Sequence, residues 1–520
     1  MNEQPVTTSK RLVHNTFFNL VTFAAYAVIA FLLMRFFLSH LGEDRYSVWL
    51  LIGGSIFRYG PLLNLGLNSA INRYIPLYRA KGDADGVQRV ISTSLFFFVA
   101  VGVVCIAASI VIYFNVGSWF AAIRPELVQS AGILVLIFGF SVAISMPLQL
   151  STAVLSGLQR YDISNTVSLG VLLLRTVLVV VLLSRGYGLL ATGLVFGLGE
   201  IAIRVLDSIF LSRLLPATFP SLKKIDLGLL REMLAYGINT FLYSMGIVII
   251  NYASQVVIGI FMGPGEINQF AFATAGVILL LQLVQAATAA IKPAVSDLDV
   301  RNDHVRVKEI AFLTRKYSLL LIIPSGCFLI VMGGDFLRIW VGDKFSDPAI
   351  LEGMGLIAAI FAVAYCLMLA QHSNFLVLVG RGEHKIFGVL IVWTALLCVA
   401  ASVVSVRVMG LGLLGIAWSN LLPILLSSGI ILPMYFNWKM GISAGENIRN
   451  VWKPALSGSL PAVLMICLWK YLAAPGSWLE LGAVVASAAI LTCVGGWFLS
   501  LTSLERTRFA HIALRKKDRG

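Results

Sequence analysis

Charged residues are scarce in this chain. Only 12% of its 520 residues are Asp, Glu, Lys or Arg, whereas 58% are hydrophobic and the mean hydropathy is +0.89. Soluble domains carry about 25% charged residues, so the composition excludes a soluble globular protein and indicates a polytopic membrane protein. The six cysteines all lie in apolar segments without disulfide or metal-ligand spacing, which argues against a disulfide scaffold or a zinc site.

Nucleotide-binding and catalytic motifs are also missing. The chain contains no P-loop, no H-E-x-x-H and no Ser/His/Asp constellation in a suitable context, so neither an ATP-driven pump nor a hydrolase is indicated. Gly-Leu-Gly-Leu-Leu-Gly at residues 410–415 fits the dinucleotide pattern but opens an apolar helix and follows no soluble strand. We therefore expect no resident cofactor or metal. Nucleic acid is not an expected partner, because the basic residues form no patch interleaved with aromatics.

Apolar runs predict fourteen transmembrane helices and an all-α fold. The expected spans lie near residues 14–39, 46–76, 90–114, 128–155, 163–184, 188–212, 230–262, 267–296, 315–334, 349–379, 386–406, 410–438, 452–473 and 478–502. Gly60 and Pro61 are expected to kink the second span. Every predicted external loop is short, which leaves no room for an extramembrane catalytic domain.

The distribution of Lys and Arg predicts the orientation. Most of the 39 basic residues fall in alternate loops and in the C-terminal tail, and the opposite loops hold only Arg45, Arg124, Arg185, Arg338, Lys344, Arg407 and Lys470. The positive-inside rule therefore places both termini in the cytoplasm. The net charge of +14 thus mostly reflects topology, and the basic tail is expected to touch anionic membrane lipids.

Two short strings recur at one offset. Asn-Thr-Phe-Phe at residues 15–18 returns as Asn-Thr-Phe-Leu at 239–242, and Gly-Tyr-Gly-Leu-Leu at 186–190 returns as Gly-Leu-Gly-Leu-Leu at 410–414, each 224 residues later. With six helices per copy, the repeat predicts two lobes of the same orientation. They cover residues 1–214 and 215–440, and residues 441–520 add helices 13 and 14 and the tail. Duplicated halves commonly hold a substrate site between them.

Charged side chains at mid-membrane require a reason, because each costs about 2.5–3.5 kcal/mol on insertion scales. Arg58 lies near the middle of the second predicted helix, and Arg175 near the middle of the fifth. Ser69 and Asn72 fall on the same side as Arg58 at helical spacing. We expect a cationic pocket that binds an anionic headgroup through bidentate hydrogen bonds. The alternative is that the arginines pair with structural acids or backbone carbonyls.

The sixth predicted helix carries the densest polar cluster. Gly193, Gly197, Glu200, Arg204 and Asp207 project to one face at 100° per residue. The glycines would let a neighbouring helix approach, and Arg204 can pair with either acid along the helix. One interpretation is a structural ion cluster that locks this helix into its lobe. The other assigns Glu200 or Asp207 to coupling with H⁺ or Na⁺ and adds Arg204 to the anion site.

Uncharged polar stripes mark the first and seventh predicted helices. Asn19 and Tyr26 share one face of the first, and the seventh offers Asn239, Tyr243 and Asn251. Such stripes either hold helices together or line a wet cavity that accommodates sugar hydroxyls, and the sequence leaves both open. Because the second half has no Asp, Glu or Arg near mid-membrane, charge recognition is expected mainly in the first half.

Three segments carry a resemblance to a known family. They are Leu-Gly-Glu-Asp-Arg-Tyr-Ser-Val-Trp at 41–49, Leu-Asn-Leu-Gly-Leu-Asn-Ser-Ala at 63–70 followed by Arg73-Tyr74, and Leu-Ser-Gly-Leu-Gln-Arg-Tyr at 155–161. On these motifs and the fourteen predicted helices, the chain resembles the multidrug/oligosaccharidyl-lipid/polysaccharide exporter superfamily. Within that superfamily it is similar to the Wzx-type polysaccharide flippases of bacteria.

The resemblance implies a transporter and not an enzyme. It implies two six-helix lobes in a V, flanked by helices 13 and 14, that move a polyprenyl-pyrophosphate-linked oligosaccharide outward across the bacterial inner membrane by alternating access. The product would be a surface polysaccharide such as O-antigen or exopolysaccharide. A polysaccharide polymerase and chain-length machinery are the implied protein partners, beside membrane lipids.

Three other functions stay open from the sequence. A lipid II flippase would also have fourteen helices and cavity arginines, although its early Asn-Arg and Phe-Val-Pro patterns are not evident. A multidrug exporter would have twelve helices and a coupling Asp in the first, where residues 14–39 contain no acid. A membrane glycosyltransferase or polysaccharide polymerase would need catalytic groups at one membrane face, commonly in a sizeable external loop.

Overall fold

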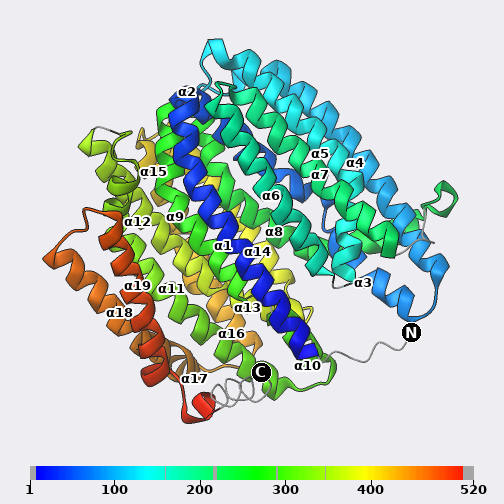
Figure 1. Cartoon of the computed structure of the whole chain (residues 1–520). Helices are drawn as coiled ribbons and strands as arrows, with labels where there is room; N and C mark the ends of the chain where they lie inside the picture. Colours follow the sequence, from blue (N-terminus) through cyan, green and yellow to red (C-terminus); the bar gives the residue numbers. More distant parts are fainter. Residues whose placement is uncertain (1–7, 159, 215–219, 289–290, 346, 508–520) are drawn as a thin grey trace. The chain divides into compact units, whose positions relative to one another are not determined.

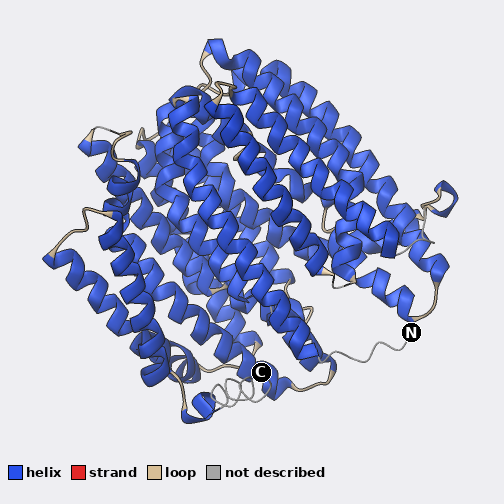
Figure 2. Cartoon of the chain, in the orientation of Figure 1, coloured by secondary structure: helices blue, strands red, loops and turns tan. Residues whose placement is uncertain are grey.

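A computed structural model describes residues 8–158, 160–214, 220–288, 291–345 and 347–507, with side chains from residue 25 onward except at 293 and 300. Within these ranges the regular elements are all helices and no strand occurs (Figure 2). The predicted all-α fold is confirmed. Figure 1 shows the helices in chain order.

The longer helices follow one another with short connections. Their bounds are α1 (Thr8–Leu41), α2 (Glu43–Ile52), α3 (Leu67–Ala80), α4 (Ala84–Trp119), α5 (Val128–Gly157), α6 (Tyr161–Ser184), α7 (Leu189–Leu214), α8 (Leu227–Phe261), α9 (Pro264–Thr288), α10 (Ile291–Val300), α11 (His304–Val341), α12 (Pro348–Ala370), α13 (His372–Gly380), α14 (Lys385–Arg407), α15 (Gly412–Ile424), α16 (Leu432–Lys439), α17 (Ala444–Asn447), α18 (Lys453–Leu472) and α19 (Trp478–Gly495). Among the shorter segments, η1 (Ile56–Asn64) is a 3₁₀ helix and η4 (Leu425–Ile431), η5 (Ile448–Trp452) and η6 (Gly496–Ser500) are π-helical.

The last twelve predicted spans are confirmed. Among the described residues, twelve helices are long and apolar enough to cross a membrane, and they begin with Ala84–Trp119 and end with Trp478–Ser500. The first predicted span lies within α1. The structure describes the side chains of α1 from residue 25 onward, and over Ala25–Leu41 the helix is apolar. The chain is therefore a multi-pass membrane protein.

The second predicted span is not one continuous helix. Instead of a kinked helix over residues 46–76, the structure has α2, the 3₁₀ segment η1 and α3. Two glycines, Gly53 and Gly54, end α2, and Pro61 lies within η1. The prediction that Ser69 and Asn72 share a helical face with Arg58 is therefore wrong, because η1 and the turn after it change the rotation between them.

A left-handed turn separates η1 from α3. Leu65 has φ 46° and Gly66 has φ 81°, a conformation that is costly for a side chain such as leucine. Asn64 holds the turn, since its Nδ2 donates to the carbonyl of Pro61 over 2.7 Å and its Oδ1 accepts from the backbone N of Gly66 over 2.8 Å. A Cβ on Gly66 would collide with the backbone of Gly237 in α8, so α3 and α8 meet backbone to backbone.

The chain divides into two compact units. Unit 1 comprises Met1–Ala271 and Lys385–Ile416, and unit 2 comprises Phe272–His384 and Ala417–Gly520. The lobe boundaries at residues 214 and 440 stay a prediction. Two long helices of matching position begin alike: Asp83 caps α4 by accepting from the backbone N of Gly86, and Asp303 caps α11 by accepting from that of Arg306. Each cap follows a residue of positive φ, as a repeated plan predicts.

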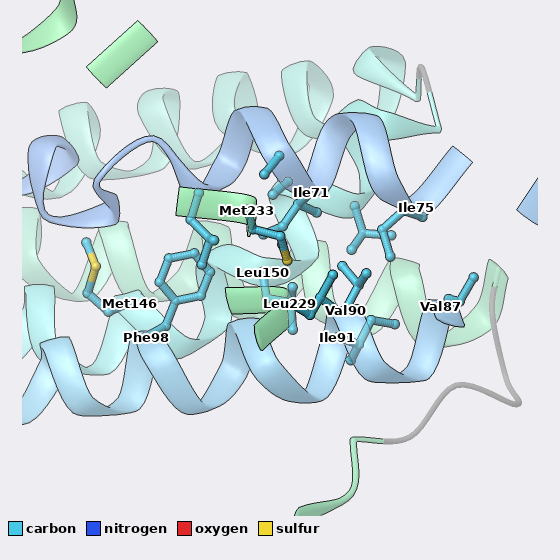
Figure 3. Packing of buried hydrophobic residues seen from close by; sticks show 14 residues of the cluster. Ile71, Ile75, Val87, Val90, Ile91, Phe98, Met146, Leu150, Leu229 and Met233 are labelled. Atoms are coloured by element: carbon cyan, nitrogen blue, oxygen red, sulfur yellow. The ribbon is translucent and has the colours of Figure 1, made fainter. Parts of the chain in front are cut away.

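A buried hydrophobic core of unit 1 joins α3, α4, α5 and α8 (Figure 3). Ile71 and Ile75 of α3 and Phe98 of α4 belong to this core, and α8 adds Leu229 and Met233. All five side chains are buried. Removal of a buried Phe or Ile side chain from such a core typically costs about 2–5 kcal/mol, so this packing fixes where α3 and the start of α8 lie.

Gly66→Ala is expected to destabilise the protein far more than Gly82→Ala. Both glycines have positive φ, 81° and 69°, so both substitutions carry a left-handed backbone cost of about 1–2 kcal/mol. Only the Cβ at residue 66 would also strike backbone, at Gly237, whereas nothing lies within 4 Å of a Cβ at residue 82. Thermal unfolding of the two purified variants in detergent measures the difference. Equal losses of stability would contradict the close α3–α8 contact.

In unit 2, ion pairs join α18 and Glu505, near the C-terminus, to α11. Lys470 of α18 contacts Asp335 of α11 with Nζ and Oδ2 2.5 Å apart. Lys316 of α11 donates to both carboxylate oxygens of Glu505 over 2.6 and 2.8 Å, and their side chains are only 5% and 12% exposed. Burial alone would raise the pKa of Glu505, but the Lys316 ammonium and the Thr502 backbone N–H lower it below its usual range.

Glu505→Gln is expected to remove an acid-sensitive part of the stability. Because the folded pKa lies below the ordinary value of 4.5, the carboxylate stabilises the fold above that pH, and this contribution is lost as the pH falls through the folded pKa. Melting curves of wild type and variant should therefore converge toward low pH. Glu126→Gln, which changes an exposed carboxylate, is the control and should run parallel to wild type. A Glu505→Gln curve parallel to wild type would refute the pairing.

Candidate anion site in unit 1

Small residues bring α7 into close contact with its neighbours. A Cβ on Gly193 would strike Leu134 and one on Gly197 would strike Ser141, both on α5. On the side of α6, a Cβ on Gly199 would lie 3.6 Å from Cδ of Arg175. The expected close approach at Gly193 and Gly197 is confirmed, and it places the polar side chains of α5, α6 and α7 beside one another.

Glu200 lies between two arginines. Its Oε1 is 3.8 Å from Nη1 of Arg175, and its Oε2 is 4.0 Å from Nη2 of Arg204. The side chain of Glu200 is 50% exposed, whereas those of Arg175 and Arg204 are 14% and 24% exposed. The guanidinium of Arg175 also lies 4.7 Å from the ring centroid of Phe196, within cation–π range. Two long ion contacts to one carboxylate leave guanidinium N–H donors for an incoming anion.

Asp207 is linked to Arg204 through a hydroxyl. Thr152 of α5 donates to Oδ2 of Asp207 over 2.6 Å and accepts from Nη1 of Arg204 over 2.9 Å. The Arg204–Asp207 contact expected along α7 is thus mediated by Thr152. Asp207 is fully buried, and its Oδ1 has no hydrogen-bond partner in the part of the chain that the structure describes. Burying a carboxyl costs free energy unless it is paired and hydrogen-bonded, and Thr152 connects Asp207 to the guanidinium of Arg204.

Arg58 reaches this cluster from η1. Its side chain is exposed, and its guanidinium lies 6.0 Å from the ring centroid of Tyr252 on α8. Glu200 and Arg204 of α7 and Arg175 of α6 are therefore adjacent in the structure, and Arg58 is positioned by its contact with Tyr252.

The other predicted contacts lie elsewhere in unit 1 or outside the description. The side chain of Asn19 belongs to the undescribed ones. Asn72 of α3 lies beside the end of α5, because a Cβ on Gly157 would be 3.3 Å from the Cα of Asn72. Asn239 and Tyr243 lie where α8 meets α14, since a Cβ on Gly388 would be 3.0 Å from the Asn239 carbonyl oxygen and 3.3 Å from the Tyr243 nitrogen. Asn251, half-buried, precedes Tyr252.

Two hydroxyl partners in this region, Thr152 and Ser55, were not predicted. Thr152 gave no signal, because a threonine in an apolar helix usually bonds only its own preceding turn. Ser55 Oγ lies within hydrogen-bond distance of Oε1 of Gln255 and of the carbonyl of Leu50, which joins the end of α2 to α8. Gln255 and Tyr252 lie on α8, the seventh predicted helix, and its polar stripe alone does not identify their partners.

The arrangement is suited to an anion. Arg58, Arg175 and Arg204 contribute three positive charges, and Glu200 is the accessible carboxylate among them. Guanidinium groups bind phosphate oxygens in bidentate fashion and stay charged at every physiological pH. The described residues contain no group of three or more His, Cys, Asp or Glu that could hold a metal ion.

Comparison with known proteins bears on the fold and on the family. A family model described as "Polysaccharide biosynthesis protein" matches residues 83–349. No curated protein sequence gives a significant match. Among solved structures, lipid II flippase MurJ in an inward closed conformation is similar with a TM-score of 0.66 and 14% identity, over 94% of this chain and 97% of that one.

Two further transporters are also similar in structure. An inward-facing MATE family multidrug resistance transporter of the MOP superfamily gives a TM-score of 0.63 at 14% identity, over 82% of this chain and 98% of that one. A MOP superfamily transporter from Pyrococcus furiosus gives 0.60 at 14% identity, over 83% and 96%. At these identities the likeness shows the fold, which is that of MOP transporters and flippases.

Proposed function

This chain belongs to the polysaccharide biosynthesis protein family, whose model spans more than half of it, and from that premise we propose which lipid it moves. The substrate is a polyprenyl-pyrophosphate-linked oligosaccharide, carried from the cytoplasmic to the external leaflet of the bacterial inner membrane for a surface polysaccharide such as O-antigen or exopolysaccharide. The observation that carries the proposal is that Arg175 and Arg204 flank one half-exposed carboxylate, Glu200, and the proposal adds Arg58, whose exposed guanidinium lies against Tyr252.

In this proposal the arginines bind the pyrophosphate. The guanidinium groups replace the water around the phosphate oxygens, while Tyr26 and the polar side chains Asn19, Asn239, Tyr243 and Asn251 contact the sugars and Asn72 lines their path. The polyprenyl tail stays in lipid. The two lobes then open alternately to the cytoplasm, where both termini lie, and to the exterior.

Coupling to an ion gradient is assigned to the two acids of α7. Glu200 is exposed to the site and contacts both arginines, whereas Asp207 is buried and reaches them through Thr152. Binding of H⁺ or Na⁺ at either carboxyl would change the charge that the arginines present to the pyrophosphate. Transport requires no further cofactor in this scheme. A polysaccharide polymerase and chain-length machinery would use the delivered product.

One alternative substrate has a specific observation in its favour. The similarity to the lipid II flippase extends over 94% of this chain, against 82% for the multidrug transporter, so helices 13 and 14 have counterparts there. A peptidoglycan precursor is therefore the second candidate, and a drug-like cation is disfavoured by the positive charge of the site. Catalysis by a glycosyltransferase or polymerase is not proposed, because the accessible acid is engaged by two arginines.

The lipid-linked intermediate that accumulates when the gene is deleted tests the substrate. The proposal predicts undecaprenyl-linked oligosaccharide repeat units on the cytoplasmic side of the inner membrane, with peptidoglycan synthesis intact. Accumulation of lipid II instead would favour the second candidate. Unpolymerised repeat units on the external side would indicate a polymerase and refute transport.

A further inference from the structure

A second arginine of the broken helix is stacked on aromatic rings. The guanidinium of Arg73 in α3 lies 4.5 Å from the ring centroid of Tyr236 in α8 and 6.0 Å from that of its neighbour Tyr74. Tyr74 meets Tyr236 edge to face at 6.5 Å and is stacked with Tyr78 at 6.2 Å. Among the described residues, Arg73 is therefore held by tyrosines of two helices and by no acid.

The position of this cluster is fixed by packing around it. Gly237, the residue after Tyr236, contacts the backbone of Gly66, and the neighbouring Met233 is buried in the core shared by α3, α4, α5 and α8 (Figure 3). Ile75 of α3 lies in the same core. Both sides of the arginine–tyrosine contact are thus anchored on rigid helices, which keeps the guanidinium oriented without an ion pair.

The donors of Arg73 are free to bind a ligand. No hydrogen bond or ion pair engages its side chain among the residues that the structure describes, and the residue is exposed. Stacking on a ring face leaves the in-plane N–H groups available for a bidentate contact. Tyr236 is itself 41% exposed, so part of an aromatic ring lies beside the free guanidinium edge.

This cluster is separate from the one around Glu200. Arg58 pairs with Tyr252 and Arg73 with Tyr236, and these tyrosines are sixteen residues apart on α8, which corresponds to about 24 Å along a helix. A pyrophosphate bound by Arg58 and Arg175 could not contact Arg73 at the same time.

We propose that Arg73, Tyr74 and Tyr236 form a second binding site for a phosphate-linked saccharide, at which the headgroup first docks before it reaches the central arginines. The free guanidinium edge binds phosphate oxygens, and the exposed ring of Tyr236 provides an apolar face for a sugar. The substrate assignment rests on the proposed function. The same chemistry would also recognise the phosphate of an anionic phospholipid, and the experiment distinguishes the two sources.

Pyrophosphate binding to the purified full-length protein tests the site. Calorimetry is done with the Arg58→Ala/Arg175→Ala double variant, which removes two of the three central arginines and so makes the contribution of Arg73 to the binding of inorganic pyrophosphate measurable. Adding Arg73→Ala should weaken binding about tenfold or more, the loss of one charge-assisted bidentate contact. Arg79→Ala, an exposed arginine of the same helix without a ring partner, should leave affinity within about twofold. Tyr236→Phe should retain binding and Tyr236→Leu should weaken it.

Two results would overturn the site itself. Equal weakening by Arg73→Ala and Arg79→Ala would indicate diffuse surface charge, and absence of pyrophosphate binding in the double variant would leave no second site. The lipid arm repeats the titration in nanodiscs with and without phosphatidylglycerol. If phosphatidylglycerol leaves the affinity for pyrophosphate unchanged, the site binds the substrate. If phosphatidylglycerol displaces pyrophosphate from the protein with Arg73 but not from the Arg73→Ala variant, the site binds a phospholipid and the substrate assignment is overturned. These binding measurements do not depend on transport, so a failure of the second site can be distinguished from a failure of the proposed function in the deletion experiment.

Discussion

Arg175→Ala is expected to abolish surface polysaccharide while the protein is still made and inserted. Arg175 is the most buried of the central arginines, at 14% exposure, and contacts both Glu200 and the ring of Phe196. Its removal deletes a charge-assisted contact worth about 1.5–3 kcal/mol and leaves Glu200 with Arg204 alone, 4.0 Å away. Substrate affinity should therefore fall about 10- to 100-fold, and polymer on the cell surface reports the loss.

The controls separate charge from geometry and from folding. Arg175→Lys keeps the charge but not the planar fork, so it should restore polymer only in part. Arg185→Ala removes an exposed arginine just beyond the end of the same helix, α6, and should have no effect. Arg58→Ala should resemble Arg175→Ala. Normal polymer in both central variants at wild-type protein levels would contradict the anion site.

Asp207→Asn is expected to remove ion-dependent transport without unfolding the protein. The amide has the volume of the carboxyl and can still accept the hydrogen bond from Thr152 that now measures 2.6 Å. It cannot bind a proton or hold a cation by charge, so a coupling role at this buried position would be lost. Transport by the reconstituted variant, measured with and without an imposed H⁺ or Na⁺ gradient, gives the result.

Two further variants distinguish a loss of coupling from a loss of stability and show which acid is responsible. Thr152→Val deprives both Asp207 and Arg204 of a partner and should lower stability by about 1–3 kcal/mol, a loss that Asp207→Asn should not show. Glu200→Gln removes the exposed acid and keeps its volume. An unchanged ion dependence in Asp207→Asn together with its loss in Glu200→Gln would assign coupling to Glu200. Unchanged dependence in both would refute coupling through α7.

Hydropathy and glycine spacing were sufficient for most of the scaffold. Long apolar runs located the last twelve spans, because a helix that crosses the bilayer needs about 20 consecutive apolar residues, and such runs are rare elsewhere. The contact of Gly193 and Gly197 with α5 also followed from their spacing, since small residues on one face admit a neighbour. The break before α3 could not be read in the same way. Gly60 and Pro61 predicted a kink, whereas the left-handed turn rests on the local hydrogen bonds of Asn64 and on the contact of Gly66 with Gly237, and hydropathy reports neither.

The site was predictable as a set of charges and not as a set of contacts. Arg58 and Arg175 are conspicuous because charge is rare in apolar segments, and their joint role in one anion site stays a prediction. The hydroxyl that joins Arg204 to Asp207 comes from α5, fifty residues away, and periodicity says nothing about such a partner. Arg73 and Tyr236 are likewise ordinary residues in sequence and become a cluster only when α3 packs on α8.

Transbilayer movement of the lipid-linked oligosaccharide in proteoliposomes tests the central claim most directly. Purified wild-type protein is reconstituted with the lipid-linked repeat unit in the inner leaflet, and an impermeant glycosidase detects sugar that reaches the outer leaflet. We expect exposure of the sugar with wild type and with Arg185→Ala, and background levels with Arg58→Ala/Arg175→Ala. Background levels with wild type, or undiminished movement in the double variant, would contradict a flippase that carries its substrate by these arginines.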